Sequence, residues 1–151
     1  MERACIGLIS DTHGLVRPQA LVALEGVDLI LHAGDVCGEG IVEELAAIAP
    51  TVAVAGNCDS DPTLPPHRLL VVAGARILLH HGHLAIHESA HRADVIVTGH
   101  THQPRIVTEG GVLRVNPGSA GPRRFSLPVT VARLTVAGGR STAELIELDV
   151  R

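Results

Sequence analysis

Five short polar motifs, each placed directly after an apolar run, hold the residue types that bind divalent metal ions. Ten histidines stand out in this chain of 151 residues. Imidazole nitrogens mixed with carboxylate and amide oxygens suit Mn²⁺, Fe²⁺, Zn²⁺ or Ni²⁺ better than Mg²⁺ or Ca²⁺ alone. The candidate ligands in the five motifs are Asp11, His13, Asp35, Asn57, His81, His100 and His102. The sequence therefore predicts metal chemistry before any other kind.

The number of candidate ligands favours two ions over one. Seven side chains are too many for a single tetrahedral or octahedral ion that must keep a position open for substrate. A carboxylate has two oxygens and can contact two cations, and Asp35 is the natural bridge. We therefore expect a pair of neighbouring divalent ions.

The elements that must position these ligands can be predicted from hydrophobic patterning. Apolar runs rich in Val, Ile and Leu are typical of strands covered on both faces. We expect strands at 4–9, 27–31, 52–55, 69–73, 77–79 and 94–97, and helices at 18–25 and 39–49. Alternating strands and helices predict parallel βαβ units. Because parallel strands of one sheet end on the same side, the motifs should converge in a single crevice.

After residue 104 the pattern changes to that of an antiparallel meander. We expect its strands at 105–108, 112–115, 129–136 and 143–148, joined by turns that contain glycine. No linker, repeat or low-complexity tract separates one part of the chain from another. The sequence predicts one α/β domain over residues 1–151, with parallel and antiparallel strands mixed.

Residue types that the chain lacks exclude several functions. It contains no Lys, which excludes Schiff-base chemistry and a P-loop lysine. It contains no Trp or Tyr, and Phe125 is its one Phe, which excludes an aromatic stacking platform for single-stranded nucleic acid. A formal net charge of −4 argues against a nucleic-acid polymer as partner. We find no membrane-length apolar run and no signal peptide, and three cysteines whose spacing fits no disulfide framework. We expect a cytoplasmic protein with reduced cysteines and no membrane partner.

The motifs in combination resemble those of the calcineurin-like metallophosphoesterases. They read Asp11-Thr12-His13, Gly34-Asp35, Gly56-Asn57-Cys58-Asp59, His81-Gly82-His83 and Gly99-His100-Thr101-His102. The closing Asn116-Pro117-Gly118-Ser119 and the short length resemble the small YfcE-type phosphodiesterase branch, whose fold is shared with the small retromer subunit. The resemblance implies a four-layer α/β/β/α sandwich of two mixed sheets, with a binuclear site at the strand ends.

The resemblance also implies a division of the ligands between two ions. One ion would be held by Asp11, His13, Asp35 and His102, and the other by Asp35, Asn57, His81 and His100. Mn²⁺ is the first expectation, with Ni²⁺, Fe²⁺, Zn²⁺ or Mg²⁺ as alternatives. Two such ions against two aspartates leave about two positive charges, or one once a hydroxide bridges them, which would attract a phosphoester.

The activity implied is hydrolysis of a small phosphoester, a diester ahead of a monoester. A hydroxide that bridges the two ions would attack phosphorus. Asp35, Asn57 and His83 are the candidate catalytic residues. The natural substrate stays open, and so does the oligomeric state, for which a homo-oligomer is one option.

Cys58 departs from the broader family, which often has a His at this position to protonate the leaving oxygen. A thiol with an ordinary pKa near 8.5 is a poorer acid at neutral pH than an imidazolium. We therefore expect a preference for aryl or cyclic diesters, whose leaving groups need little protonation. Otherwise Cys58 is most simply a small packed residue, and the identity of the general acid is open.

Other polar residues have a structural interpretation beside a functional one. His83 is either a substrate contact or a loop filler, and Asp59 is expected to support a ligand rather than to be one. His32 lies inside an apolar run and is expected to be a core histidine with a hydrogen-bond partner. His87 and His91 are four residues apart but lack the Glu of a zincin motif, so a solvated face is favoured.

The loop after residue 116 is harder to interpret. Asn116 is most simply a turn residue, although the family suggests that it braces the site. Arg123 and Arg124, beside Phe125, would contact an anionic substrate or a partner chain, or lie in an exposed loop. The sequence does not decide between these interpretations.

Two rival functions are kept beside hydrolysis. The first is a non-catalytic, metal-binding scaffold that resembles the small retromer subunit, which the scarcity of aromatic anchors argues against. The second is a His-rich zinc buffer, which would bind zinc stoichiometrically without turnover.

Overall fold

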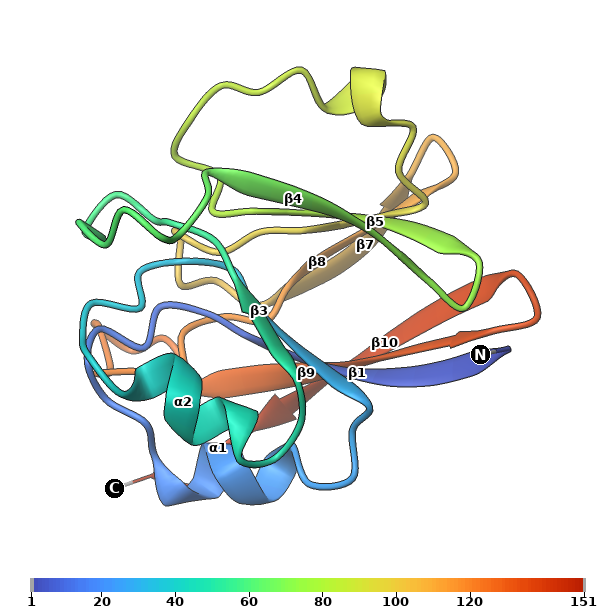
Figure 1. The fold of residues 1–151 in the computed structure, drawn as a ribbon. Helices are drawn as coiled ribbons and strands as arrows, with labels where there is room; N and C mark the ends of the chain where they lie inside the picture. Colours follow the sequence, from blue (N-terminus) through green and yellow to red (C-terminus); the bar gives the residue numbers. More distant parts are fainter. Residues whose placement is uncertain (1, 151) are drawn as a thin grey trace.

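The computed structural model describes residues 2–150, in which two five-stranded sheets stack face to face (Figure 1). The strands of the first sheet lie in the order β10 (Arg140–Glu147), β9 (Thr130–Ala137), β1 (Arg3–Ile9), β2 (Leu29–His32) and β3 (Thr51–Ala53). Those of the second lie in the order β4 (His67–Val72), β5 (Ala75–His80), β6 (Val95–Val97), β8 (Val112–Asn116) and β7 (Arg105–Glu109). Every predicted strand is present, with shifted ends.

Each sheet contains three neighbouring parallel strands. In the first sheet β1 pairs with β2, with Ile6 opposite Leu29, and β2 pairs with β3. In the second sheet β5, β6 and β8 run parallel to one another. The argument from hydrophobic patterning placed the ligand-bearing strands in one sheet, whereas the parallel set is divided between two sheets, as the family resemblance implied.

The strands after residue 104 also divide between the sheets, so the prediction of one antiparallel meander was wrong. The β7–β8 hairpin completes the second sheet, whereas the β9–β10 hairpin pairs with β1 in the first. The connection over residues 117–129 carries the chain from one sheet to the other. Hydrophobic patterning reports that a segment is a strand, but it does not report which neighbour the strand pairs with.

The helices lie on the outer face of the first sheet (Figure 1). α1 (Pro18–Ala23) and α2 (Ile41–Ala46) are shorter than expected, and they bury Ala20, Ile41 and Leu45 against it. The second sheet is covered only by the segment that contains the 3-10 helix η1 (Glu88–His91). The expected four layers are present, and the fourth is thin. Within residues 2–150 no helix combines the length and apolar character needed to cross a bilayer.

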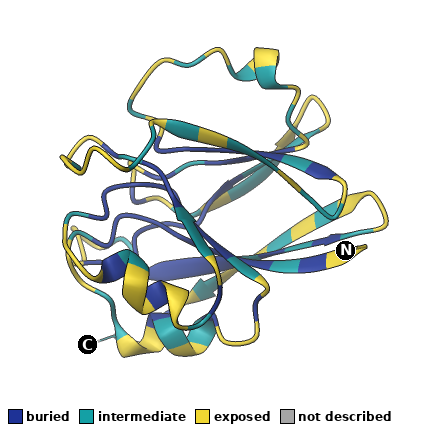
Figure 2. Ribbon diagram, viewed as in Figure 1, coloured by how far each residue is buried: buried dark blue, intermediate teal, exposed yellow. Residues whose placement is uncertain are grey.

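The main core fills the space between the two sheets and is aliphatic throughout. Leu8 and Leu134 from the first sheet meet Ile77, Leu79 and Val97 from the second. The strands inside each sheet, such as β5 and β9, are largely dark blue in Figure 2 and therefore buried, whereas the edge strands β4 and β10 are teal and yellow. Because the chain has no Trp or Tyr, branched side chains alone provide the packing that holds the two sheets together.

Truncating a side chain in this core should destabilise the fold. Leu8 is completely buried, so we expect Leu8→Ala to lower the free energy of unfolding by about 2–5 kcal/mol. The matched control is Val71→Ala on β4, whose residue is 65% exposed and whose effect should stay within about 0.5 kcal/mol. Urea unfolding followed by far-ultraviolet circular dichroism measures both. Equal effects for the two variants would contradict this placement of the core.

Candidate metal centre

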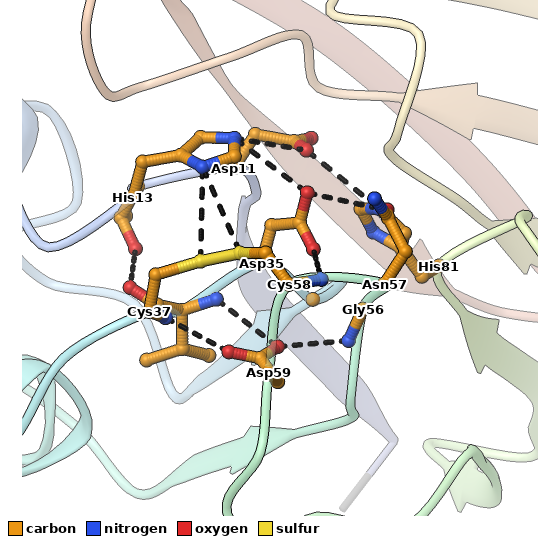
Figure 3. The surroundings of a disulfide bond; sticks show 12 residues. Asp11, His13, Asp35, Cys37, Gly56, Asn57, Cys58, Asp59 and His81 are labelled. Atoms are coloured by element: carbon orange, nitrogen blue, oxygen red, sulfur yellow. Dashed lines mark hydrogen bonds and ion pairs between the residues drawn. A yellow bond between two sulfur atoms is a disulfide. The ribbon is translucent and has the colours of Figure 1, made fainter.

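All seven predicted ligands lie together, where the carboxyl ends of five strands meet. Asp11 and His13 follow β1, Asp35 follows β2, Asn57 follows β3, His81 follows β5, and His100 and His102 follow β6. Figure 3 shows Asp11, Asp35 and His81 turned toward one another. The two sheets end at the same side of the molecule, so the ligands converge although they come from different sheets.

The first group of ligands surrounds an oxygen of Asp11. This oxygen, Oδ1, is buried and has no hydrogen-bond partner among the described residues. It lies 3.4 Å from His102 Nε2 and 3.8 Å from His13 Nε2. Asp11 Oδ2, in contrast, accepts hydrogen bonds from Ser10 Oγ at 2.7 Å and from the His100 backbone N–H at 3.1 Å. A buried carboxylate oxygen without a donor is costly, and a cation at this point would remove the cost.

The second group surrounds the side-chain oxygen of Asn57. Asn57 Oδ1 lies 3.0 Å from His81 Nε2 and 3.1 Å from His100 Nδ1. His81 Nδ1 lies 2.8 Å from the carbonyl oxygen of Ala33, which can only accept, so Nδ1 carries the hydrogen. In the neutral ring, the lone pair of His81 Nε2 faces the amide oxygen of Asn57. A cation between these two acceptors would satisfy both, and the Ala33 contact is the kind of support that metal-binding histidines have.

Asp35 lies between the two groups. Its Oδ2 is 3.3 Å from His81 Nε2 and 3.6 Å from His13 Nε2. Its Oδ1 accepts a hydrogen bond from the Cys58 backbone N–H at 3.0 Å. One oxygen of Asp35 therefore has a nitrogen from each group beside it, as a bridging carboxylate requires.

Most of the candidate ligands have a left-handed backbone conformation. The φ values are 56° at Asp11, 46° at His13, 56° at Asp35, 73° at His100 and 62° at His102. Left-handed backbone costs about 1–2 kcal/mol at a residue other than glycine. Such conformations persist only where the surrounding structure imposes them, and they are concentrated at functional sites. Here they turn each ligand inward just beyond the end of its strand.

Asp59 ties the ligand loop after β2 to the loop after β3. Its carboxylate accepts hydrogen bonds from the backbone N–H groups of Cys37 at 2.8 Å, Val36 at 3.2 Å and Gly56 at 2.8 Å. A side chain at Gly56 would overlap the carboxylate of Asp35, so the two loops need a glycine there. These contacts agree with either role expected of Asp59, that of supporting a ligand or that of a turn residue, and its support of a metal ligand stays a prediction.

The loop after β8 braces the site from the other side. Asn116 Nδ2 donates to the carbonyl oxygen of Gly99 at 3.0 Å and to Thr101 Oγ1 at 3.1 Å. Ser119 Oγ donates to the carbonyl oxygen of Asp11 at 3.1 Å. Sequence reasoning missed Ser10, which holds Asp11 Oδ2. Its position at the end of an apolar run, next to a candidate ligand, was the signal available.

His83 lies beside the second group of ligands. Its ring centroid is 5.2 Å from that of His81 and 6.3 Å from that of His100, and its Nδ1 is buried without a partner among residues 2–150. Burial lowers the pKa of His83. Burial also lowers the pKa of His102, which favours the neutral ring that a metal ion needs. A substrate contact for His83 stays a prediction.

His32 is a core histidine, as predicted. It is fully buried, its Nδ1 accepts a hydrogen bond from the Gly34 backbone N–H at 3.1 Å, and its Nε2 lies 3.0 Å from Thr12 Oγ1. Since Nδ1 accepts, Nε2 carries the hydrogen and donates to Thr12, whose hydroxyl donates to the carbonyl oxygen of Val36. Burial lowers the pKa of His32 to about 4. The neutral ring links the loops that carry Asp11 and Asp35.

Cys37 and Cys58 form a disulfide (Figure 3), so the prediction of reduced cysteines was wrong for this pair. Their Cα atoms are 6.2 Å apart although 21 residues separate them in the chain. The reason is that each follows the end of one of two neighbouring parallel strands, which spacing rules for compact frameworks do not detect. Cys58 is also exposed rather than the small packed residue that we expected. Cys5 is a free cysteine.

The remaining candidates lie outside the cluster. His87 is exposed, and His91 packs its ring edge-on to His67 at 5.1 Å. Arg123 and Arg124 lie in an exposed loop, and Phe125 is 94% exposed. The pKa of His102 is lowered first by burial, and the positive charge of Arg124 lowers it further.

A cavity of about 450 Å³ opens beside the second group of ligands. It lies between the second sheet and the segment that leads into η1, with His100 in its wall. Charged and aliphatic side chains both line it, among them Leu84, Glu88, Arg105 and Arg114. Glu88 accepts hydrogen bonds from Arg114, so one arginine is held in place there. The cavity has the size and mixed lining of a site for a small molecule.

Comparison with known proteins assigns the class of this fold and site. The sequence model for the calcineurin-like phosphoesterase superfamily domain matches residues 5–139. The chain therefore belongs to the calcineurin-like phosphoesterase superfamily, as the motifs predicted.

Two relatives narrow the assignment. The chain is 36% identical to a probable metallophosphoesterase of Methanothermobacter thermautotrophicus, over 93% of this chain and 91% of the relative. It is 30% identical to phosphodiesterase YfcE of Escherichia coli K12, over 83% of this chain and 84% of the relative.

Solved structures share the fold. A predicted phosphoesterase from Streptococcus pneumoniae superposes with a TM-score of 0.76 at 24% identity, covering 97% of this chain and 91% of that one. Zinc-complexed Vps29 from Entamoeba histolytica superposes with a TM-score of 0.68 at 22% identity, covering 95% and 98%. These two likenesses show only a shared fold, which occurs both in a protein named as a predicted phosphoesterase and in Vps29.

The buried neutral state of His32 predicts a pH dependence of stability. Because the folded pKa of about 4 lies below the unfolded value near 6.5, the unfolded chain binds more protons between these pH values. Stability should therefore be complete above pH 6.5 and fall by about 3 kcal/mol as the pH drops toward 4. Urea unfolding from pH 7 to pH 5 measures the slope. His32→Gln should be less stable at pH 7 and should lose this part of the slope; an unchanged slope would contradict the prediction.

Proposed function

We propose that this protein is a phosphoric ester hydrolase that binds two divalent ions and acts on a small phosphodiester in preference to a monoester. The observation that carries the proposal is the convergence of histidine nitrogens on Asp11 Oδ1, which has no hydrogen-bond partner among the described residues, and on Asn57 Oδ1. Membership of the superfamily supports a phosphoester as the substrate. The relative named as a phosphodiesterase supports a diester.

The donor set fits two ions, with Mn²⁺ proposed first. The first would be held by Asp11, His13, Asp35 and His102, and the second by Asp35, Asn57, His81 and His100. When bound, such a pair supplies an activated water molecule and cationic contacts to the phosphoryl oxygens, which makes a lysine unnecessary. Ni²⁺, Fe²⁺, Zn²⁺ and Mg²⁺ are the alternatives.

Other groups of the chain fix the orientation of the proposed metal ligands. Ser10 and the His100 backbone N–H fix one oxygen of Asp11, so that the other faces the two histidines. The carbonyl oxygen of Ala33 fixes the ring of His81 in the same way. Ligands held by such contacts need no rearrangement as charge develops on the phosphoryl group, and this preorganisation is a large part of catalysis.

The organic part of the ester has room beside His100. The cavity of about 450 Å³ shares His100 with the proposed centre, so a phosphoryl group at the ions can extend its substituent into the cavity. His83, beside His81 and His100, is proposed to contact the substrate at this side.

Cys58 does not serve as the proton donor for the leaving oxygen. In its disulfide with Cys37, Cys58 carries no thiol proton at all. We therefore keep the preference for aryl or cyclic diesters, whose leaving groups depart without a strong general acid.

The scaffold alternative has one supporting observation, the Vps29 structures among those that share the fold. Superfamily membership and the relative named as a phosphodiesterase favour hydrolysis over a scaffold. We further propose that residues 1–151 form one domain and act in the cytoplasm, with a homo-oligomer left open.

Removing the shared ligand should abolish turnover. Loss of a residue that only supports a metal ligand costs about 10- to 100-fold, so Asp35→Asn should lower kcat/KM by more than about 100-fold. The measurement is hydrolysis of bis(p-nitrophenyl) phosphate with added Mn²⁺. Asp61→Asn, in an exposed loop, is the control and should retain activity. Tight stoichiometric zinc with no turnover by the unmodified protein would instead support the zinc buffer.

The leaving group should control the rate. General acid catalysis is worth about 10²- to 10⁴-fold, so without it alkyl diesters should turn over at least about 100-fold more slowly than activated aryl diesters. Single-turnover rates for methyl and p-nitrophenyl leaving groups on one phosphoryl core measure this dependence. Equal rates, in a regime where chemistry is limiting, would show that a general acid has been overlooked.

A further inference from the structure

His13 presents its two ring nitrogens to different sets of donors. Its Nε2 faces Asp35 Oδ2 at 3.6 Å and Asp11 Oδ1 at 3.8 Å. Its Nδ1 faces Cys37 Sγ at 3.7 Å and Cys58 Sγ at 3.8 Å. Figure 3 shows the ring between the carboxylates and the two sulfurs. One nitrogen is thus available to the oxygen-rich centre and the other to a pair of sulfur atoms.

Each of the two sulfurs lies at a ligand-like separation from His13 Nδ1, and the sulfurs must part from each other before they can bind one ion. All three atoms lie within 4.8 Å of one another. Tetrahedral zinc with a Zn–S distance of about 2.3 Å and a Zn–N distance of about 2.0–2.1 Å places nitrogen and sulfur about 3.6 Å apart. The two separations in this protein, 3.7 and 3.8 Å, are close to that value.

The two cysteines are positioned by the backbone and not by their own bond alone. Asp59 holds the Cys37 backbone N–H and the Gly56 backbone N–H, so both loops stay together when the sulfurs separate. The Cα atoms are 6.2 Å apart, toward the wide end of the disulfide range of about 4.4–6.8 Å. Cys58 is exposed and Cys37 is half-buried, so an ion can reach the pair from solvent.

We propose that, in the reduced protein, His13 Nδ1, Cys37 Sγ and Cys58 Sγ form a third metal site, which takes Zn²⁺. One nitrogen and two thiolates are a donor set that zinc prefers, and that Mn²⁺ and Mg²⁺ do not. The site differs in chemistry from the carboxylate-rich centre beside it, and it does not depend on whether that centre hydrolyses phosphoesters. Because His13 belongs to both, an ion at the sulfurs changes the affinity of the neighbouring centre.

The disulfide and the ion exclude each other, since the same sulfurs form both. A small-molecule disulfide is the co-reactant that converts one state into the other. One cysteine thiolate attacks it, forms a mixed disulfide and releases one small-molecule thiolate; the second cysteine thiolate then displaces the other. The two cysteines are oxidised, the co-reactant is reduced to two thiolates, and Zn²⁺ is released.

Co²⁺ is the probe for this site, because thiolate ligands give cobalt an intense charge-transfer absorption band in the near ultraviolet. The full chain, reduced and freed of metal, should develop this band as Co²⁺ is added and should bind one more equivalent than the oxidised chain. Cys37→Ser and Cys58→Ser should each lose the band and that equivalent. Cys5→Ser is the matched control, since Cys5 lies on β1 away from this cluster, and should keep both. Circular dichroism confirms that each variant is folded.

The unmodified protein decides the proposal even if a serine variant fails to fold. Absence of the band from the reduced chain, with all three thiols shown to be free by thiol titration, would overturn the proposal. So would a band that survives in folded Cys37→Ser and Cys58→Ser. The weaker visible bands of Co²⁺ bound to carboxylate and imidazole would persist in either case, so failure here is distinguishable from failure of the proposed hydrolase.

Discussion

The unpaired oxygen of Asp11 is the constraint on which the site depends. Its partner oxygen is satisfied by Ser10 and by the His100 backbone, so the carboxylate cannot rotate to satisfy the other. The Nε2 atoms of His13, His81 and His102 lie 3.4–3.8 Å from the free oxygen, and the Nδ1 hydrogen of His81 is committed to a carbonyl group. Repulsion between acceptors is therefore built into the centre, and a cation relieves it.

Packing between the two sheets holds the candidate ligands in this unfavourable arrangement. An aliphatic core locks the two sheets together, and the strand ends then have fixed positions relative to one another. Left-handed turns at the ligands and a glycine where two loops touch are tolerated because this core leaves the loops no alternative path. Asp59 and Asn116 add the local bracing.

The sequence was sufficient to predict the strands and to predict which residues gather as candidate metal ligands. Apolar runs located every strand because buried parallel strands carry little else, and the ligands could be identified because each directly follows a run. What the runs lack is information on strand partners, so the division into two sheets followed only from the family resemblance, and the destination of the β9–β10 hairpin was missed. The Cys37–Cys58 pair was missed for the same reason, since it depends on β2 and β3 being neighbours. The metal ligands themselves remain a prediction, now supported by geometry.

The position of β1 between β2 and β9 has a consequence for how the fold assembles. Residues 3–8 pair with residues 132–137, and Ser119 contacts the carbonyl oxygen of Asp11. Contacts of such long sequence separation form late and slowly. One edge of β1 therefore stays open, and Asp11 lacks its brace, until the β9–β10 hairpin docks onto the first sheet.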